Sequence, residues 1–195
     1  MSQLSILLLF VCASCINFKP AAMPRYFEPQ LSLTDPVSTT RAVELRLRPV
    51  TGVNHLRERM VWRRPGGEVG FHDFLRWTDY PTSYLQRALE RELFESQSFT
   101  RSSSTQASTA DVVLIAFEEV CADSPFVEAA ATLRVYSPAM TALCEQTIRT
   151  TRPLADDLPE TKVAAYSDAL QDLVLQMAGR LRTLHEGAAT TRANH

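Results

Sequence analysis

The sequence predicts an α+β fold, a two-layer sandwich in which a mixed or antiparallel sheet of about six strands is covered by two helices. Segments in which polar and apolar residues alternate, as in half-buried strands, come in two groups of three. Each group is followed by a segment whose apolar residues recur at three- and four-residue steps, the spacing of an amphipathic helix. The predicted order is therefore β-β-β-α-β-β-β-α. With 195 residues, 45% of them hydrophobic, the chain is long enough for one such core.

Residues 1–14 are predicted to be a signal peptide, since Leu4 to Ala13 is almost continuously apolar. This run is too short to cross a membrane, which takes roughly 20 apolar residues. The small residues Ala13 and Ser14 directly precede Cys15, a pattern that resembles a bacterial lipobox. We therefore expect a lipid anchor at Cys15, where the thiol would carry a diacylglyceryl group. The alternative is an ordinary cleaved signal peptide.

Residues 15–40 contain four prolines and no sustained period, so they are predicted to form a lipid-anchored tether. Ile16 follows the cysteine, in place of the aspartate that retains lipoproteins in the inner membrane of enteric bacteria. The lipobox resemblance therefore implies the periplasmic face of the outer membrane in a Gram-negative envelope. The single folded domain is expected over 41–187, with a flexible tail over 188–195.

The first group of predicted strands begins with the half-buried strand 41–50. Residues 57–64 and 68–73 flank the triplet Pro65-Gly66-Gly67, which predicts a hairpin. Proline is favoured in a first helical turn, and we expect a helix over 81–96.

A loop rich in serine and threonine is expected over 100–109. Three strands should then form an antiparallel meander with tight turns between them. They cover residues 112–121, 126–136 and 143–152. A final helix is expected from Pro159, with Gly187 as its stop.

The meander also predicts the state of two cysteines. Cys121 should lie opposite about Val127, and Cys144 opposite about Arg134. Seven residues of strand separate those positions, or about 23 Å. A disulfide needs Cα atoms within about 7 Å, so we expect both thiols to be unpaired.

The chain carries no strong indication of catalysis. Its net charge of -2 gives no positive field for nucleic acid, and it contains no P-loop, GxSxG, HExxH or CxxC motif. Glu118 and Glu119 are neighbours on a strand and should point to opposite faces, one of them to solvent, so they cannot act as an acid and base pair. No two of the histidines share metal-ligand spacing, so neither a metal site nor a cofactor is expected. These are His55, His72, His185 and His195.

Several arginines surround a tryptophan on the predicted hairpin, and they are the candidate partner-binding residues. They are Arg57, Arg59, Trp62, Arg63 and Arg64. Such a group could present a cationic surface to acidic lipid headgroups or to a protein. The alternative is an ordinary exposed strand face, balanced by Glu58 and Glu68.

The run from Arg57 to Arg63, then Phe71, then Arg76 to Pro81 and a leucine-rich helix, resembles the ABC-type transport auxiliary lipoproteins. The resemblance covers nearly the whole mature chain. It makes Trp77, Asp79 and Pro81 a structural motif at the junction of strand and helix.

The resemblance implies a non-catalytic, outer-membrane-anchored periplasmic accessory subunit of an ABC/MCE-type lipid transport system, docking the transport conduit and supporting envelope integrity. Its expected partner is a mammalian-cell-entry (MCE) domain periplasmic protein and, through it, an ABC permease and ATPase. A homo-oligomer is possible. One alternative is an envelope assembly or pilot lipoprotein unrelated to transport. Another is a periplasmic hydrolase whose site draws on His72, Asp73 and Asp79.

Overall fold

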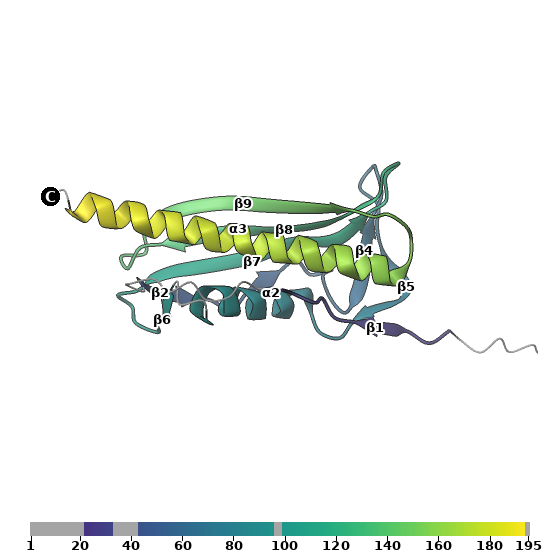
Figure 1. Ribbon diagram of the computed structural model, residues 1–195, viewed down its shortest axis with the longest axis horizontal. Coiled ribbons are helices and arrows are strands. Elements are labelled where there is room, and N and C mark those ends of the chain that lie inside the picture. Colours follow the sequence, from purple (N-terminus) through teal and green to yellow (C-terminus); the bar gives the residue numbers. More distant parts are fainter. Residues whose placement is uncertain (1–21, 33–42, 96–98, 194–195) are drawn as a thin grey trace, which may run out of the picture.

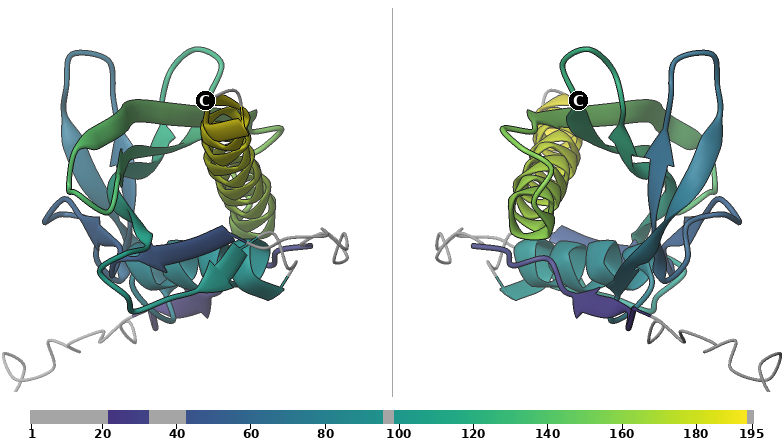
Figure 2. Two further views of the ribbon diagram at one scale, coloured as in Figure 1. Left: turned by 90° about the vertical axis from the view of Figure 1, so that its left-hand side faces the viewer. Right: turned by 90° about the vertical axis from the view of Figure 1, so that its right-hand side faces the viewer.

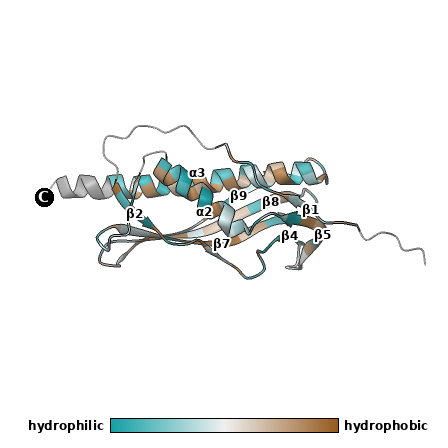
Figure 3. Cartoon of the chain, turned by 90° about the horizontal axis from the view of Figure 1, so that it is seen from below, coloured by the Kyte–Doolittle hydropathy of each residue, from teal (hydrophilic) through white to brown (hydrophobic). Residues whose placement is uncertain are grey.

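The computed structural model describes residues 22–32, 43–95 and 99–193. Within these residues, nine strands form one curved mixed sheet, and two helices cover one of its faces (Figures 1 and 3). The predicted α+β fold class is confirmed. The sheet has more strands than the sequence indicates, because three of the nine are only two or three residues long. The predicted signal peptide and Cys15 lie outside the described residues.

The predicted antiparallel meander is present and forms one side of the sheet. Its strands are β7 (Ser108–Val120), β8 (Phe126–Tyr136) and β9 (Ala142–Pro153). Val112 lies opposite Leu133, and Ala131 lies opposite Ile148. Cys144 lies opposite Val135, whereas Cys121 follows the end of β7, and both are free cysteines. The prediction of two unpaired thiols is therefore confirmed.

The predicted hairpin is formed by β4 (Arg59–Arg63) and β5 (Val69–Trp77). Gly66 and Gly67 take φ angles of 91° and 90°, which favour glycine, and this explains why the chain turns there. β4 also pairs in parallel with the end of β7, so the hairpin extends the sheet beyond the meander.

Short parallel strands complete the sheet beside β7. They are β2 (Val43–Leu47), β3 (Thr51–Gly52) and β6 (Phe99–Arg101). The sequence predicts one strand over 41–50 and a loop over 100–109, and both predictions are wrong in part. Val43 pairs with Phe99, and β7 starts at Ser108, so neighbouring strands recruit residues whose own composition favours a loop.

The predicted tether over 15–40 is wrong for its described residues. β1 (Arg25–Phe27) pairs in parallel with the end of β5. The main-chain N–H groups of Gln30 and Ser32 then donate to the Ser167 hydroxyl and the Gln171 amide oxygen, each at 3.0 Å. The prolines exclude a helix but leave an extended segment free to bind the domain.

Two helices bury the sheet's inner face. α2 (Pro81–Glu90) continues into a π-helical turn, η1 (Arg91–Glu95), and the long helix α3 (Pro159–Ala193) packs on β8 and β9. Viewed along the molecule, the sheet curves around both helices (Figure 2). The predicted stop of α3 at Gly187 is wrong, and the helix continues past it. Glycine inside a helix costs only about 1 kcal/mol, and alanines follow it.

Aromatic rings fill the core where β5, β7 and the helices meet. Trp77 is 1% exposed, and its ring contacts those of Phe117, Tyr84 and Tyr166 at centroid distances of 5.3, 6.1 and 4.9 Å. The Tyr166 hydroxyl donates to the Val61 carbonyl oxygen at 3.2 Å, so the ring's polar end is also satisfied. This cluster fixes the hairpin relative to α3.

Candidate functional site

Glu118 and Glu119 lie side by side near the end of β7, where the hairpin, the meander and α3 come together. Their side chains are 2% and 7% exposed. They point to opposite faces of the sheet and bind different partners, as neighbours on a strand should. The expectation that one of them faces solvent is wrong, because each carboxylate is covered by the cations that bind it.

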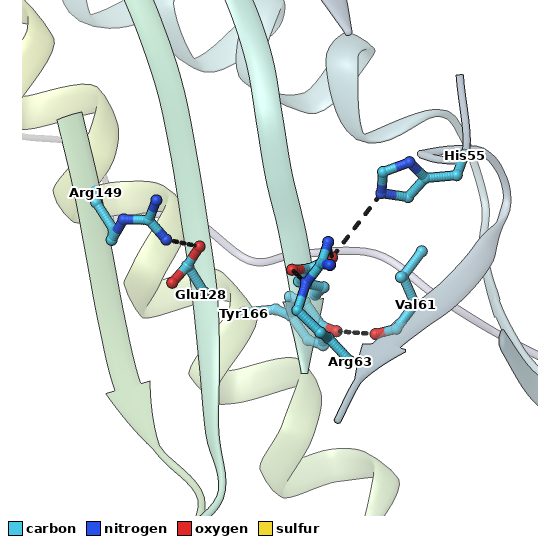
Figure 4. A network of polar contacts seen from close by, with 7 residues as sticks. His55, Val61, Arg63, Glu128, Arg149 and Tyr166 are labelled. Atoms are coloured by element: carbon cyan, nitrogen blue, oxygen red, sulfur yellow. Dashed lines mark hydrogen bonds and ion pairs between the residues drawn. The ribbon is translucent and has the colours of Figure 1, made fainter. Parts of the chain in front are cut away.

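On the outer face of the sheet, Glu118 binds Arg63 through both carboxylate oxygens, one of them at 3.1 Å from Nη2. Figure 4 labels Arg63 and the neighbouring His55, Glu128 and Arg149. His55 Nε2 lies 3.9 Å from the Glu118 carboxylate. Glu128, directly opposite Glu118 on β8, is paired with Arg149. Two carboxylates thus lie next to each other, and each is paired with an arginine from the strand on its other side. Burial opposes ionisation of Arg63, yet the hydrogen bond with Glu118 is stronger and raises the arginine's pKa.

On the inner face, Glu119 accepts from His72 Nε2 at 2.9 Å and from Lys162 Nζ at 2.8 Å. Lys162, in the first turn of α3, is 3% exposed and also binds Asp157 at 2.5 Å. Burial alone would raise the pKa of Glu119, but the bonds from His72 and Lys162 outweigh it and the pKa is lowered. Burial likewise opposes ionisation of Lys162, and the two carboxylates reverse this and raise its pKa. The result is a closed ion-paired group that ties β5 and β7 to α3.

The five hairpin residues predicted to bind a partner do not form one continuous face. Arg63 points across the outer face of the sheet to Glu118 and is committed to that carboxylate. Three other arginines are more exposed and lie over aromatic rings: Arg57 over Tyr80, Arg59 over Phe71 and Arg64 over Trp62, at 5.6, 5.0 and 4.6 Å. Trp62 lies opposite Gly70, the neighbour of Phe71, so the two rings are on opposite faces of the hairpin. We call Arg57, Arg59, Arg64 and these rings, which line both faces of the hairpin and its base, the arginine–aromatic rim.

Trp62 is the member of this group that sequence reasoning explains least. It lies opposite Gly70, and a Cβ added at Gly70 would come 2.1 Å from the indole ring. Gly70 is therefore required for Trp62 to lie flat across the hairpin, with Arg64 above it. A glycine inside an otherwise strand-like segment is the observation that could have revealed this close approach.

The motif residues Trp77, Asp79 and Pro81 lie at the junction of β5 and α2. Trp77 is in the core, and Pro81 is the first helical residue. Asp79 accepts from Arg87 Nη1 at 2.7 Å and from the N–H of Tyr80 at 2.7 Å, and its pKa is lowered chiefly by the arginine. The motif sets the direction in which α2 leaves the sheet.

The residues considered for a hydrolase are not brought together. His72 is bound to Glu119, Asp79 is bound to Arg87, and Asp73, 81% exposed, lies near Arg59. No group of three potential metal ligands occurs among the described residues. An apolar-lined hollow of about 430 Å³ lies elsewhere, beside Val43 and the end of α3. In the part of the chain described, no helix is long and apolar enough to cross a membrane.

The sequence model of the family described as "ABC-type transport auxiliary lipoprotein component" matches residues 28–178 of this chain. The chain belongs to the ABC-type transport auxiliary lipoprotein family. This match spans β2 to most of α3, so it includes both ion-paired carboxylates and the arginine–aromatic rim. The comparison with curated proteins gives no match.

Solved structures with the same fold support the architecture of this lipoprotein family member. A protein of Xanthomonas campestris, 15% identical, covers 85% of this chain and 99% of its own, with a TM-score of 0.75. A hypothetical protein of Chlamydia trachomatis, 10% identical, covers 73% of this chain and 96% of its own, with a TM-score of 0.53. At these identities the likeness concerns the fold alone.

Proposed function

We propose that this family member is a non-catalytic accessory subunit of an ABC/MCE-type lipid transport system, anchored in the periplasmic face of the outer membrane. One observation carries the proposal: the match to an auxiliary lipoprotein component of ABC-type transport extends over almost the whole folded chain. The role is one of position. Cys15 holds the protein at the membrane, and the folded domain docks an MCE-domain periplasmic protein at the end of the conduit.

The arginine–aromatic rim is the docking surface in this proposal. Its rings include Phe71 and Tyr80, which are 36% and 40% exposed. Arginine and large aromatic side chains are the residues that most often contribute binding energy at protein interfaces. The buried carboxylates have a different role, since each is already bound by cations of the same chain and holds the hairpin that presents the rim.

Mild crosslinking in native envelopes, followed by detergent extraction and mass spectrometry, tests the proposal on the full chain. We expect recovery of an MCE-domain protein, together with a Cys15 peptide that carries lipid. Recovery of outer-membrane assembly factors would instead support the envelope assembly or pilot lipoprotein. An unmodified N-terminus with no partner would refute both readings.

A matched pair of variants tests the docking surface. The rim variant replaces Arg57, Arg59 and Arg64 by alanine. The control variant removes the same charge from exposed arginines elsewhere and replaces Arg48, Arg91 and Arg101 by alanine. We expect the rim variant to lower the yield of crosslinked partner by at least about tenfold and the control to leave it unchanged. Equal losses in the two variants would show that crosslinking depends on net charge and not on the rim.

Two further single variants distinguish the proposal from a hydrolase. Alanine at His72 and Asp73 would abolish an activity assembled from those side chains. In an accessory subunit, the Asp73 change should leave partner recovery intact, and the His72 change should act only through the stability of the Glu119 ion pairs. The two single variants are therefore compared at equal amounts of folded protein.

A further inference from the structure

The outer edge of β9 is the longest open strand edge among the described residues. β9 has twelve residues and is bonded to β8 throughout, while within the described residues no strand pairs with its other side. Natural edge strands are commonly protected by lysine, by proline or by a bulge that turns the edge away. β9 has no lysine, and its only proline is the last residue, Pro153. Its one register irregularity lies at its start, between Ala142 and Cys144, and leaves the rest of the edge regular.

The main-chain groups available at this edge can be assigned. The Leu154 N–H donates to the Pro125 carbonyl oxygen at 2.9 Å, so even-numbered residues of β9 direct their N–H and C=O groups to β8. Even-numbered side chains face α3: the Thr150 hydroxyl, for example, donates to the Ala169 carbonyl at 2.7 Å. Odd-numbered residues therefore point their main-chain groups to the open edge and their side chains to the outer face. They include Glu145, Thr147, Arg149 and Thr151.

We propose that this edge pairs with the same edge of a second copy of the chain, antiparallel and with the two-fold axis at Thr147. A two-fold contact uses the same surface on both copies, so the strand must be self-complementary. With Thr147 opposite its equivalent, Glu145 of each copy lies opposite Arg149 of the other. The edge groups of these three residues in each copy then exchange about six main-chain hydrogen bonds.

Charge selects this register over its neighbours. An axis at Glu145 or at Arg149 would place like charges directly opposite each other, which is unfavourable on a sheet. Axes at even-numbered residues such as Gln146 or Ile148 leave Glu145 and Arg149 opposite uncharged residues. Only an axis at Thr147 pairs both charges with their opposites.

The pairing also continues an existing row of charges on the outer face. Within one copy, Arg134 lies opposite Asp111 on one side and opposite Glu145 on the other, to which its Nε donates at 2.9 Å. Arg149 of the second copy comes next, followed by Glu128, which is paired with it. The signs alternate from Asp111 of one copy to Glu128 of the other, so no charge meets its like at the junction.

Site-directed crosslinking tests the register. In the full chain with all four native cysteines replaced by serine, Thr147→Cys places two thiols on the axis, with Cα atoms about 5.5 Å apart. That separation suits a disulfide. The control is Thr151→Cys, because its two copies would lie about 27 Å apart. We expect a disulfide-linked dimer on mild oxidation for Thr147→Cys only. Equal or absent crosslinking in the two variants overturns the proposal.

A second measurement follows the dimer without any crosslink. Thr147→Pro removes an N–H that points to the open edge, a place where a strand tolerates proline, whereas Thr147→Ala keeps it. Light scattering of the detergent-solubilised full chain should give a dimer for the wild type and Thr147→Ala. Thr147→Pro should raise the dissociation constant at least about tenfold. A wild-type monomer, or an oligomer unaffected by the proline, refutes this interface and leaves the proposed transport role untouched.

Discussion

Glu118 and Glu119 are adjacent in sequence and similarly buried, yet the two faces of the sheet hold them differently. The partners of Glu118 reach water: Arg63 and His55 have side chains 35% and 34% exposed. The partners of Glu119 are less accessible, since the side chains of His72 and Lys162 are 19% and 4% exposed. Removing the partner of a buried charge is most costly where water cannot reach the charge that remains. The inner carboxylate should therefore depend on its cation far more than the outer one does.

The largest expected effect follows removal of the inner cation. Lys162→Met leaves Glu119 buried with His72 and the weak Cys121 thiol donor as partners, and should lower the free energy of unfolding by about 3 kcal/mol in urea titrations. The double variant with Glu119→Gln serves as the control. It should recover most of the loss, because no unpaired charge remains. A double variant no more stable than the single one would contradict this account.

Removal of the outer cation should cost less. Arg63→Met takes the two hydrogen bonds away from Glu118, but water and His55 can approach the carboxylate. We expect a loss of about 1.5 kcal/mol, measured in the same titrations. A loss that equals or exceeds that of Lys162→Met would show that the two faces are equivalent.

The acid dependence of stability sharpens the comparison. The pKa of Glu119 is lowered from 4.5 in the folded chain, so its contribution is present above pH 4.5 and is lost as the pH falls through the folded value. Glu119→Gln should therefore reduce the decline in stability below pH 4.5. Lys162, whose pKa is raised from 10.5, gives the opposite limb, with its contribution lost as the pH rises above 10.5. Unfolding midpoints measured from pH 3 to 11 check both limbs, and an unchanged acid limb in the glutamine variant would exclude this role.

The smallest expected effect concerns the arginines that differ from Arg63 only in where they point. The triple alanine variant of Arg57, Arg59 and Arg64 should change the free energy of unfolding by less than about 1 kcal/mol, since exposed ion pairs and cation–π contacts contribute little. Thermal melts of this variant and of Arg63→Met separate the rim from the internal ion pair. A larger loss in the triple variant would mean that the rim supports the fold.

The sequence predicts the long elements well because their patterns are long. The β8 boundaries coincide with the prediction, and the apolar residues spaced along α3 face the sheet. The short strands β1, β3 and β6 could not be predicted, because two or three residues carry no period. Their strand geometry comes from the neighbours with which they pair.

The candidate site was less accessible to sequence reasoning. The alternation on β7 does indicate that Glu118 and Glu119 face opposite ways, but no local pattern reveals partners such as Lys162, 43 positions away, or Arg63, 55 positions away. For the same reason the sequence grouped Arg63 with its exposed neighbours. Which arginine reaches Glu118 depends on the pairing of β4 with β7, which is a property of the assembled sheet.

The attachment of β1 has a mechanical consequence. A pull on the chain ahead of Arg25 acts along a strand whose bonds to β5 lie across the direction of force, so several bonds must break together. Once β1 has separated, the hydrogen bonds of Gln30 and Ser32 with α3 are the next to resist the force. A protein held at a membrane through its N-terminus would thus transmit tension into its longest helix before any part of the meander yields.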